Sequence, residues 1–148
     1  MLSRRLKGVD LSPRMLRRAR ALGLYDELEE LDLIACLERS SAATFDLVTA
    51  ADVFVYLGAL ERVFAQVARV MRPAGRFAFS VERGQAASGF ELAPSGRYRH
   101  SRAYVEALAR ENGLRVVEAR DAVLRREANR EIEGVVFVLA RDGGSTSP

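Results

Sequence analysis

The sequence contains no tryptophan and only one cysteine, one histidine and one lysine among its 148 residues. A single thiol cannot form an internal disulfide bond, so we expect a reducing compartment and assign the chain to the cytoplasm. That thiol, Cys36, shares an apolar helix face with Ile34 and Leu37, which predicts a buried and unreactive side chain. No group of Cys, His and carboxylate residues has metal-ligand spacing, and we therefore predict no metal site.

Long apolar runs are also missing. No stretch approaches the roughly 20 residues that a membrane-spanning helix needs. The basic residues Arg4, Arg5 and Lys7 are not followed by the apolar core of a secretory signal, so we predict no membrane association. The composition, 49% hydrophobic and 29% charged, is typical of one globular domain. We assign residues 1–141 to that domain and predict a disordered, polar tail over residues 142–148.

Positive charge is not gathered into a binding surface. The net charge is +3, and arginine carries nearly all of the positive side chains. Nucleic-acid binders collect such charge on one face, whereas the densest cluster here is predicted on the solvated side of a single helix. Its members are Arg14, Arg17, Arg18 and Arg20, opposite Met15, Leu16, Ala19 and Leu22. We therefore do not expect a nucleic acid as partner.

Strand and helix patterns alternate along the chain. The apolar spacing predicts strands over residues 5–9, 28–31, 45–50 and 76–81, separated by helices over 13–22, 33–37 and 60–71. Ser12 and Pro13 mark one helix start and Gly23 its end. A small hairpin around Phe90 and Tyr98 precedes a helix capped by Ser101. Residues 114–123 and 134–140 read as antiparallel strands, so the pattern predicts an α/β fold with an antiparallel hairpin at one side.

Carboxylates follow two successive predicted strands. Asp10 and Asp32 each stand at a strand end and precede an apolar residue, Leu11 and Leu33 respectively. In open α/β sheets, ligands bind beyond the carboxyl ends of the strands. A carboxylate there accepts hydrogen bonds from both ribose hydroxyls of a nucleotide, and a second acid can accept from an adenine amino group. Because Asp is also a common cap and turn residue, either one alone is a weak signal.

Three further segments stand out: GVDLSPRML at residues 8–16, FDLVTAADV at 45–53 and VMRPAGRF at 70–77. Together they resemble segments of class I S-adenosylmethionine-dependent methyltransferases of type 11/12. The first looks like the G-[VI]-D-[LI]-S-x-x-M-L segment of that family. Residues 45–53, FDLVTAADV, are similar to its fourth strand and following loop. Residues 70–77, VMRPAGRF, resemble the entry to its fifth strand, with Ala74 in place of a glycine. The resemblance covers the chain from about Leu6 to Ala140.

The resemblance implies a Rossmann-like, doubly wound and mostly parallel sheet with a C-terminal antiparallel hairpin, and S-adenosylmethionine as cofactor. It also implies the cofactor contacts. Asp10, followed by Leu11, would hold the ribose. Asp32 and Leu33 would hold the adenine, and Ala50 and Ala51 would pass close to the methionine part.

One part of the family pattern is absent. Family members begin with a strand, a glycine-rich D-x-G-x-G-x-G turn and a helix, whereas only nine residues precede Asp10 and they contain the single glycine Gly8. In the family that first strand lies between the strands ending here at Asp10 and Ala50. Its absence predicts that these two strands stand about 9–10 Å apart, which is twice the spacing of paired strands. We expect a fragment of a longer product first, and second a homodimer that compensates for the gap.

Acceptor-side candidates lie downstream. His100 is a candidate general base, and its alternative is a half-exposed residue before a helix cap. For Asp52 the alternative to a catalytic role is capping the helix after it, and for Tyr56 it is core packing. Glu82 ends a predicted strand and could face the same cleft as Asp52, but the preferred interpretation is an exposed strand-end side chain. The segment from Phe90 to His100 offers aromatic and basic side chains that suit a polar or anionic acceptor.

The leading interpretation is methyl transfer from S-adenosylmethionine to an unidentified acceptor. The alternative is a non-enzymatic remnant of the same fold that self-associates or binds a partner. A dehydrogenase-like nucleotide binder is a third interpretation. It would also place an acid after the second strand, but the terminal hairpin and the segment Pro73-Ala74-Gly75 favour the methyltransferase.

Overall fold

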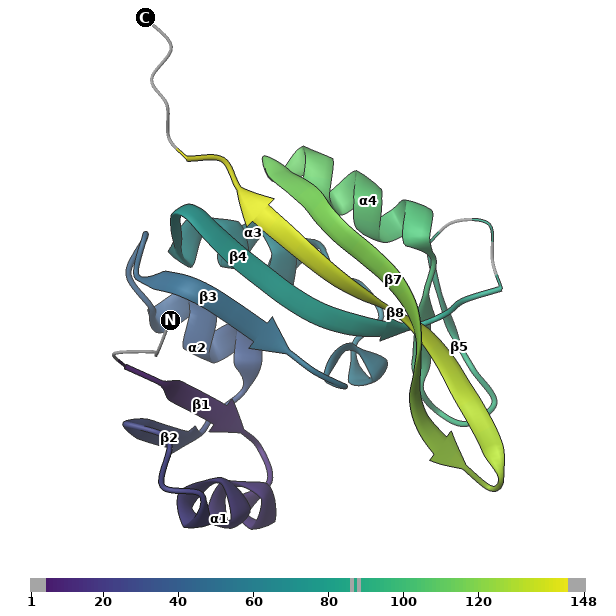
Figure 1. Ribbon diagram of the computed structural model, residues 1–148, viewed down its shortest axis with the longest axis horizontal. Coiled ribbons are helices and arrows are strands. Elements are labelled where there is room, and N and C mark those ends of the chain that lie inside the picture. The colour runs from purple at the N-terminus through teal and green to yellow at the C-terminus, as the bar shows by residue number, and fades with distance from the viewer. Residues whose placement is uncertain (1–4, 86, 88, 144–148) are drawn as a thin grey trace, which may run out of the picture. The chain divides into compact units, whose positions relative to one another are not determined.

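The computed structural model describes residues 5–85, 87 and 89–143, drawn in colour in Figure 1. Where the sequence predicted a single domain, the contacts divide the chain into two units, residues 1–40 and 41–148. Most of the predicted tail, residues 144–148, lies outside the described residues, while the carbonyl of Asp142 accepts a bond of 3.3 Å from the backbone of Ala74. No helix in the described ranges is long and apolar enough to cross a bilayer.

The first unit contains two parallel strands and two helices. Its elements are β1 (Lys7–Asp10), α1 (Pro13–Ala21), β2 (Glu27–Glu30) and α2 (Leu33–Arg39). The strands pair in register from Lys7 opposite Glu27 to Asp10 opposite Glu30, so their carboxyl ends lie at one edge. A helix connecting two parallel strands is the crossover that the alternating pattern predicted.

Local capping interactions determine where the helices of this unit begin and where α1 ends. The Ser12 hydroxyl accepts a hydrogen bond from the Met15 N–H at 3.2 Å, and Pro13 occupies the first turn, as predicted. Gly23 follows α1 in the left-handed region at φ +66°, which glycine adopts without a Cβ penalty. Asp32 caps α2 by accepting from the Ala35 N–H at 3.2 Å.

The core of the first unit is small. Its buried apolar side chains are Leu16, Cys36 and Leu37. The predicted burial of Cys36 is confirmed, and the four arginines of α1 are exposed as predicted. The predicted apolar side of α1 is buried only at Leu16, because the 40-residue unit has too little structure to cover the rest.

The second unit is built on a four-stranded sheet in the order β3-β4-β8-β7. Strands β3 and β4 are parallel, whereas β8 runs antiparallel to both β4 and β7. A separate antiparallel pair is formed by β5 and β6. The elements are β3 (Phe45–Ala50), the 3-10 helix η1 (Phe54–Tyr56), α3 (Glu61–Val70), β4 (Met71–Glu82), β5 (Phe90–Leu92), β6 (Tyr98–His100), α4 (Arg102–Glu111), β7 (Leu114–Glu127) and β8 (Arg130–Arg141). The predicted α/β class and the C-terminal antiparallel hairpin are confirmed.

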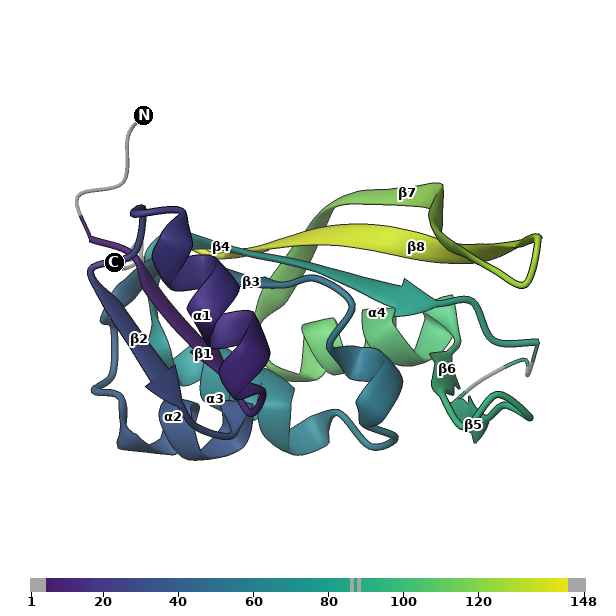
Figure 2. The same cartoon turned by 90° about the horizontal axis from the view of Figure 1, so that it is seen from below.

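Both helices of this unit cover the same face of its sheet, as Figure 2 shows. Alternate residues of β4 point to that face and are fully buried, among them Phe77 and Phe79. Their rings meet Phe64 of α3 and Phe137 of β8, with a stacked Phe79–Phe137 pair at a centroid distance of 5.3 Å. These rings pack in the core of the unit together with buried aliphatic side chains such as Leu60 and Leu139.

The junction of α3 and β4 differs from the prediction, because β4 begins at Met71, five residues before the strand predicted over residues 76–81. Met71, expected in the helix, has extended backbone (φ −78°, ψ 141°) and begins β4. Ala74 lies at φ +65°, where the resembling family segment has a glycine. A Cβ in that region costs about 1–2 kcal/mol, so this turn keeps a glycine-type conformation without the glycine.

The C-terminal hairpin is longer than predicted. Strand β7 continues to Glu127, β8 begins at Arg130, and the two residues between them, Ala128 and Asn129, have φ values of 46° and 63°. Two positive φ angles match the type I′ turn, whose twist suits a hairpin. Pairing between β4 and β8 ends at Glu82 opposite Gly134, so residues 124–133 extend past β4 as a two-stranded ribbon (Figure 1). We call this ribbon the hairpin arm.

Candidate functional site

The carboxyl edge of the first unit carries both predicted nucleotide-binding acids. Asp10 is the last residue of β1, is exposed, and accepts a hydrogen bond of 2.8 Å from the Ser12 N–H with Oδ1. Asp32 follows β2 and uses Oδ2 to cap α2. Because β1 and β2 are paired and parallel, the two carboxylates lie at the same edge, each with one oxygen engaged locally. This arrangement leaves the other oxygen of each carboxylate for a ligand hydroxyl or amine.

The apolar neighbours of these acids differ in exposure. Leu11 is 65% exposed, and Leu33 is half-buried at the start of α2. An exposed leucine directly after a strand-end carboxylate can cover an aromatic base while the carboxylate binds the sugar. These four residues are the part of the predicted cofactor site that the first unit contains.

In the second unit, the chain leaves β3 through Ala50, Ala51 and Asp52. Ala50 is buried, whereas Ala51 and Asp52 are exposed. Asp52 has a left-handed backbone, with φ at 53°, and its N–H donates to the Ser80 hydroxyl at 3.1 Å. The capping alternative for Asp52 is wrong, because η1 begins without a side-chain cap and Asp52 instead pairs with Arg125 at 2.8 Å.

A charged cluster surrounds Asp52 at the carboxyl ends of β3 and β4. Arg125 donates from Nη1 to Asp52, from Nη2 to Glu82 at 3.0 Å, and from Nε to Glu127 at 2.9 Å. Glu82 also accepts from Arg99 Nε at 3.2 Å, and Glu127 pairs with Arg97. We call these six residues the carboxylate–arginine cluster. Since it has three acids and three arginines, its formal charges cancel.

The charges in the cluster shift the pKa values of Arg125 and Glu127. Burial lowers the pKa of Arg125, but its bonds to Glu127 and Glu82 and the charge of Asp52 raise that pKa overall. The hydrogen bond from Arg125 holds the pKa of Glu127 below its usual value. Both shifts favour the charged forms of Arg125 and Glu127.

The exposure of one member, Glu82, was mispredicted, and two members, Arg125 and Glu127, were not recognised from the sequence. Glu82 was expected to be exposed, and this is wrong, because its side chain is only 5% exposed beneath two arginines. No sequence pattern indicated a site role for Arg125, because it lies 73 residues from Asp52 and 43 residues from Glu82 along the chain. Only the order of strands in the sheet brings these side chains together.

His100 ends β6 in a buried position and is 1% exposed, so the half-exposed alternative is wrong. Its Nε2 lies 2.9 Å from the Gly58 carbonyl, which can only accept, so Nε2 carries the proton in the neutral ring. The ring stacks on Tyr104 at a centroid distance of 6.2 Å, and no described residue bonds to Nδ1. These contacts suit a packing role for His100.

Stability is expected to depend on pH through His100. Burial lowers the pKa of His100 from 6.5, although bonds to the Gly58 and Leu57 carbonyls partly raise it. Between the lowered pKa of the folded chain and pH 6.5, the unfolded chain therefore binds a proton that the folded chain does not. The free energy of unfolding should fall by up to about 1.4 kcal/mol per pH unit over this range as the pH is lowered. Chemical denaturation from pH 7.5 to 5 measures this dependence.

A His100→Gln variant is the control, because its amide nitrogen stands where Nε2 does and can still donate to the Gly58 carbonyl, but the amide does not titrate. His100 is the single histidine, so the slope between pH 6.5 and 5 should flatten in the variant. Equal slopes in the two proteins would contradict the assignment of this dependence to His100.

Two tyrosines, Tyr104 stacked on His100 and Tyr56 at the end of η1, differ in their exposure to solvent. Tyr104 accepts from the Leu60 N–H at 2.9 Å, and burial raises its pKa to about 12. Tyr56 is 69% exposed, so the core-packing alternative for it is wrong. It remains a candidate for contact with a ligand in the second unit.

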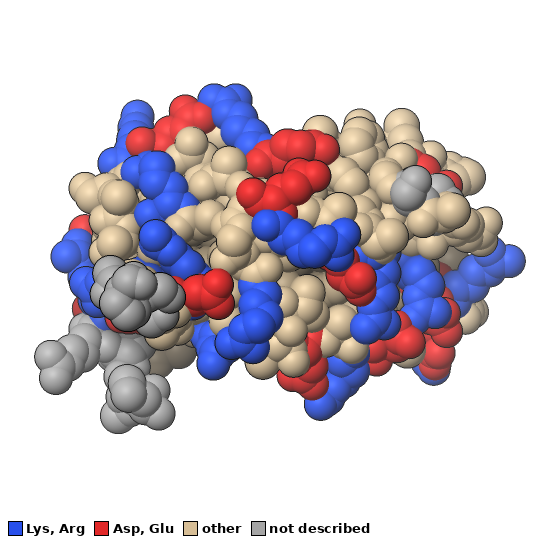
Figure 3. Space-filling model, turned by 90° about the horizontal axis from the view of Figure 1, so that it is seen from above, with Lys and Arg blue, Asp and Glu red and all other residues tan. Residues whose placement is uncertain are grey.

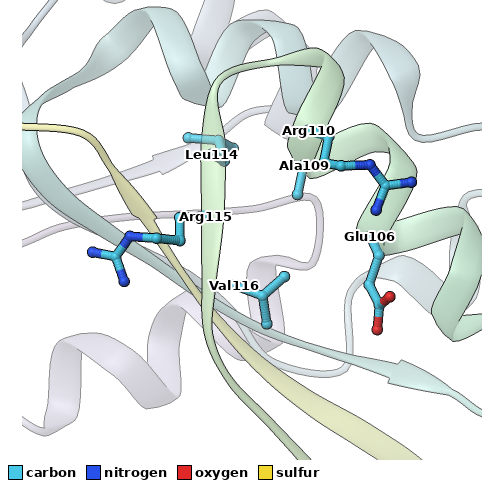
Figure 4. Close-up of a pocket in the computed structure, with 6 residues that line it drawn as sticks. All are labelled: Glu106, Ala109, Arg110, Leu114, Arg115 and Val116. Atoms are coloured by element: carbon cyan, nitrogen blue, oxygen red, sulfur yellow. The ribbon is translucent and has the colours of Figure 1, made fainter.

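The described part of the second unit also has an open hollow away from these residues. This hollow of about 490 Å³ between α4 and β7 is lined by Glu106, Ala109, Arg110, Leu114, Arg115 and Val116 (Figure 4). It lies at the amino end of β4, opposite the carboxylate–arginine cluster. Within the described residues, no group of three or more His, Cys, Asp or Glu side chains is arranged to hold a metal. On the face in Figure 3, basic and acidic side chains are interspersed.

The chain matches the methyltransferase domain family over residues 1–79. This match includes Asp10, Asp32 and Asp52 and covers just over half of the chain. No curated protein matches it.

Solved structures share the fold. A structure of S-adenosylmethionine-dependent methyltransferases from Methanosarcina mazei superposes with a TM-score of 0.69 at 15% identity, covering 92% of this chain and 81% of that one. The 1,6-didemethyltoxoflavin-N1-methyltransferase of Burkholderia thailandensis, solved with its namesake compound and S-adenosylhomocysteine, gives 0.71 at 18% identity, with 93% and 61% covered. The cyclase SpnF gives 0.75 at 13% identity, with 95% and 67% covered. At these identities the likeness establishes the Rossmann-like fold and no particular reaction.

Proposed function

Because this chain belongs to the methyltransferase domain family, we propose that it binds S-adenosylmethionine and takes part in methyl transfer to an acceptor held near Asp52. The observation that carries the proposal is the position of Asp10. It lies in the segment that matches the family, it ends a parallel strand, and it is exposed with one oxygen left for a ligand.

The residues of the first unit fit the nucleoside part of this cofactor. The Asp10 carboxylate would accept from the ribose hydroxyls, and Asp32 would accept from the adenine amino group beside Leu33. Leu11 would cover one face of the base. In the second unit, Ala50 and Ala51 present backbone and small side chains, which permit close approach by the methionine part.

Methyl transfer needs little from protein side chains beyond positioning. The cofactor supplies an already activated methyl group, so in-line alignment of the acceptor provides most of the rate enhancement. Asp52 would accept a hydrogen bond from the acceptor and so orient it. Arg97 and Arg99 are paired with Glu127 and Glu82, which favours an acceptor with an N–H or O–H group over an anionic one.

An Asp10→Ala variant tests the cofactor site. The variant should bind S-adenosylhomocysteine about tenfold to a hundredfold more weakly, since a hydrogen bond to a charged group contributes about 1.5–3 kcal/mol. Isothermal titration calorimetry of the 148-residue chain measures this difference. S-Adenosylhomocysteine is the appropriate probe because it lacks the reactive methyl group.

Asp26→Asn is the matched control. Asp26 lies just before β2, at the edge of the strand pair opposite Asp10, and bonds to the Leu6 N–H. Its variant should retain the affinity of the unmodified chain. Equal affinities in all three proteins would contradict the ribose role of Asp10, and no binding in any of them would contradict cofactor binding by this chain.

A second candidate function is that of a self-associating module. The pairing of the strands favours this function, because β1 and β3 belong to separate sheets and each has an unpaired edge among the described strands. Unpaired edges are templates for pairing with another chain. Light scattering coupled to size-exclusion chromatography should then give a dimer mass, whereas a monomer across a range of concentrations would rule out this candidate.

A further inference from the structure

The hairpin arm carries Arg125 to the carboxyl ends of β3 and β4, together with its partner Glu127. The arm lies far along the chain from these strands, and Arg125 connects them through Asp52 and Glu82. Its side chain is only 17% exposed, so the guanidinium is largely shielded from water. Ion pairs in such surroundings are screened less by salt than those on an open surface.

All three nitrogens of Arg125 have carboxylate partners. Nη1 donates to Asp52 at 2.8 Å, Nη2 to Glu82 at 3.0 Å and Nε to Glu127 at 2.9 Å. A guanidinium is planar and rigid, so three bonds in different directions fix its orientation. The position of the Nη1 group facing Asp52 is therefore set by residues other than Asp52.

Asp52 is held through its backbone N–H and through its carboxylate, but its side chain remains accessible to solvent. Its N–H donates to Ser80, its backbone is left-handed, and Oδ1 accepts from Arg125. The side chain is 51% exposed, against 5% for Glu82. Among the carboxylates bound by Arg125, Asp52 is thus the one most open to solvent.

We propose that Arg125 is a positioning residue: from the hairpin arm it holds the Asp52 carboxylate in one rotamer, with Oδ1 engaged and Oδ2 turned toward an acceptor N–H or O–H group. The identity of that acceptor group rests on the proposed function. The orientation of Asp52 does not, because it follows from contacts within the second unit.

Three-bond NMR couplings test the orientation directly. Couplings from the Asp52 backbone nitrogen and carbonyl carbon to its carboxyl carbon report whether χ1 occupies one staggered rotamer or several. The unmodified chain should show one rotamer, and Arg125→Met should show averaging over several. Arg97→Met is the matched control, because Arg97 also joins the arm to the unit but bonds to Glu127 and not to Asp52. It should keep the single rotamer.

Arg125→Lys is a second variant for the case that Arg125→Met does not fold. A lysine keeps the charge but cannot donate in three fixed directions, so partial averaging at Asp52 is expected. A single Asp52 rotamer retained in Arg125→Lys, or in a folded Arg125→Met, would overturn the proposal, as would equal averaging in Arg97→Met. Titration with S-adenosylhomocysteine separates the two proposals. If the unmodified chain does not bind this compound, the proposed function is contradicted, while the NMR couplings still decide whether Arg125 orients Asp52.

Discussion

Replacing Gly134 with alanine is expected to lower the free energy of unfolding by about 3 kcal/mol, at the upper end of overpacking effects. Gly134 lies in β8 between β4 and β7, and an added Cβ would stand 2.4 Å from the Val81 carbonyl oxygen and 2.4 Å from Leu124 Cδ1. A leucine side chain can move aside, but the carbonyl belongs to the paired backbone of β4. The strands must therefore separate locally, and the melting temperature should fall by roughly 10 °C.

Gly143→Ala is the matched control, because a Cβ at Gly143 meets no heavy atom within 4 Å. Its melting temperature should equal that of the unmodified chain. A Gly134→Ala, Leu124→Ala double variant separates the two clashes, and it should stay unstable because the Val81 carbonyl remains. A Gly134→Ala protein as stable as the Gly143→Ala protein would show that the sheet can accommodate the methyl group.

Glu82→Ala is expected to lower the free energy of unfolding by about 3–5 kcal/mol, the usual cost of removing one partner from a buried ion pair. Glu82 accepts from Arg99 with Oε1 and from Arg125 with Oε2, and its side chain is 5% exposed. Without it, two arginines face each other in a partly shielded position and repel. Urea denaturation at neutral pH measures the loss.

Glu82→Gln keeps one acceptor oxygen and the side-chain volume, so its loss should be smaller. Asp46→Ala is the control for a surface pair, because Asp46 is 79% exposed and pairs with Arg72 at 3.2 Å. Its effect should stay within about 1 kcal/mol, as for other exposed pairs. Similar losses in Glu82→Ala and Asp46→Ala would mean that the carboxylate–arginine cluster behaves as surface charge.

Much of the fold was predictable because its signals are local. The Ser12 cap, the proline at the start of α1 and the glycine after it act within a few residues, and all three predictions are confirmed. The alternation of strands and helices follows from side-chain periodicity, which burial imposes directly on the sequence. The length of the terminal hairpin was less predictable. Its outer residues extend past β4, so burial in the core does not impose an alternation of apolar and polar side chains on them.

The candidate site likewise has one part that the local sequence predicts and another that only the packing of the strands decides. The sequence by itself determined the strand-end carboxylates Asp10, Asp32 and Asp52, because a residue directly after a parallel strand must lie at its carboxyl edge. Their proposed cofactor and acceptor roles remain predictions. Only the tertiary structure decided what surrounds Asp52 and His100. Burial of Glu82 and His100, and the contact of Arg125 with Asp52 across 73 residues, depend on which strands become neighbours. Sheet order is a property of the packed chain, so no local pattern encodes it.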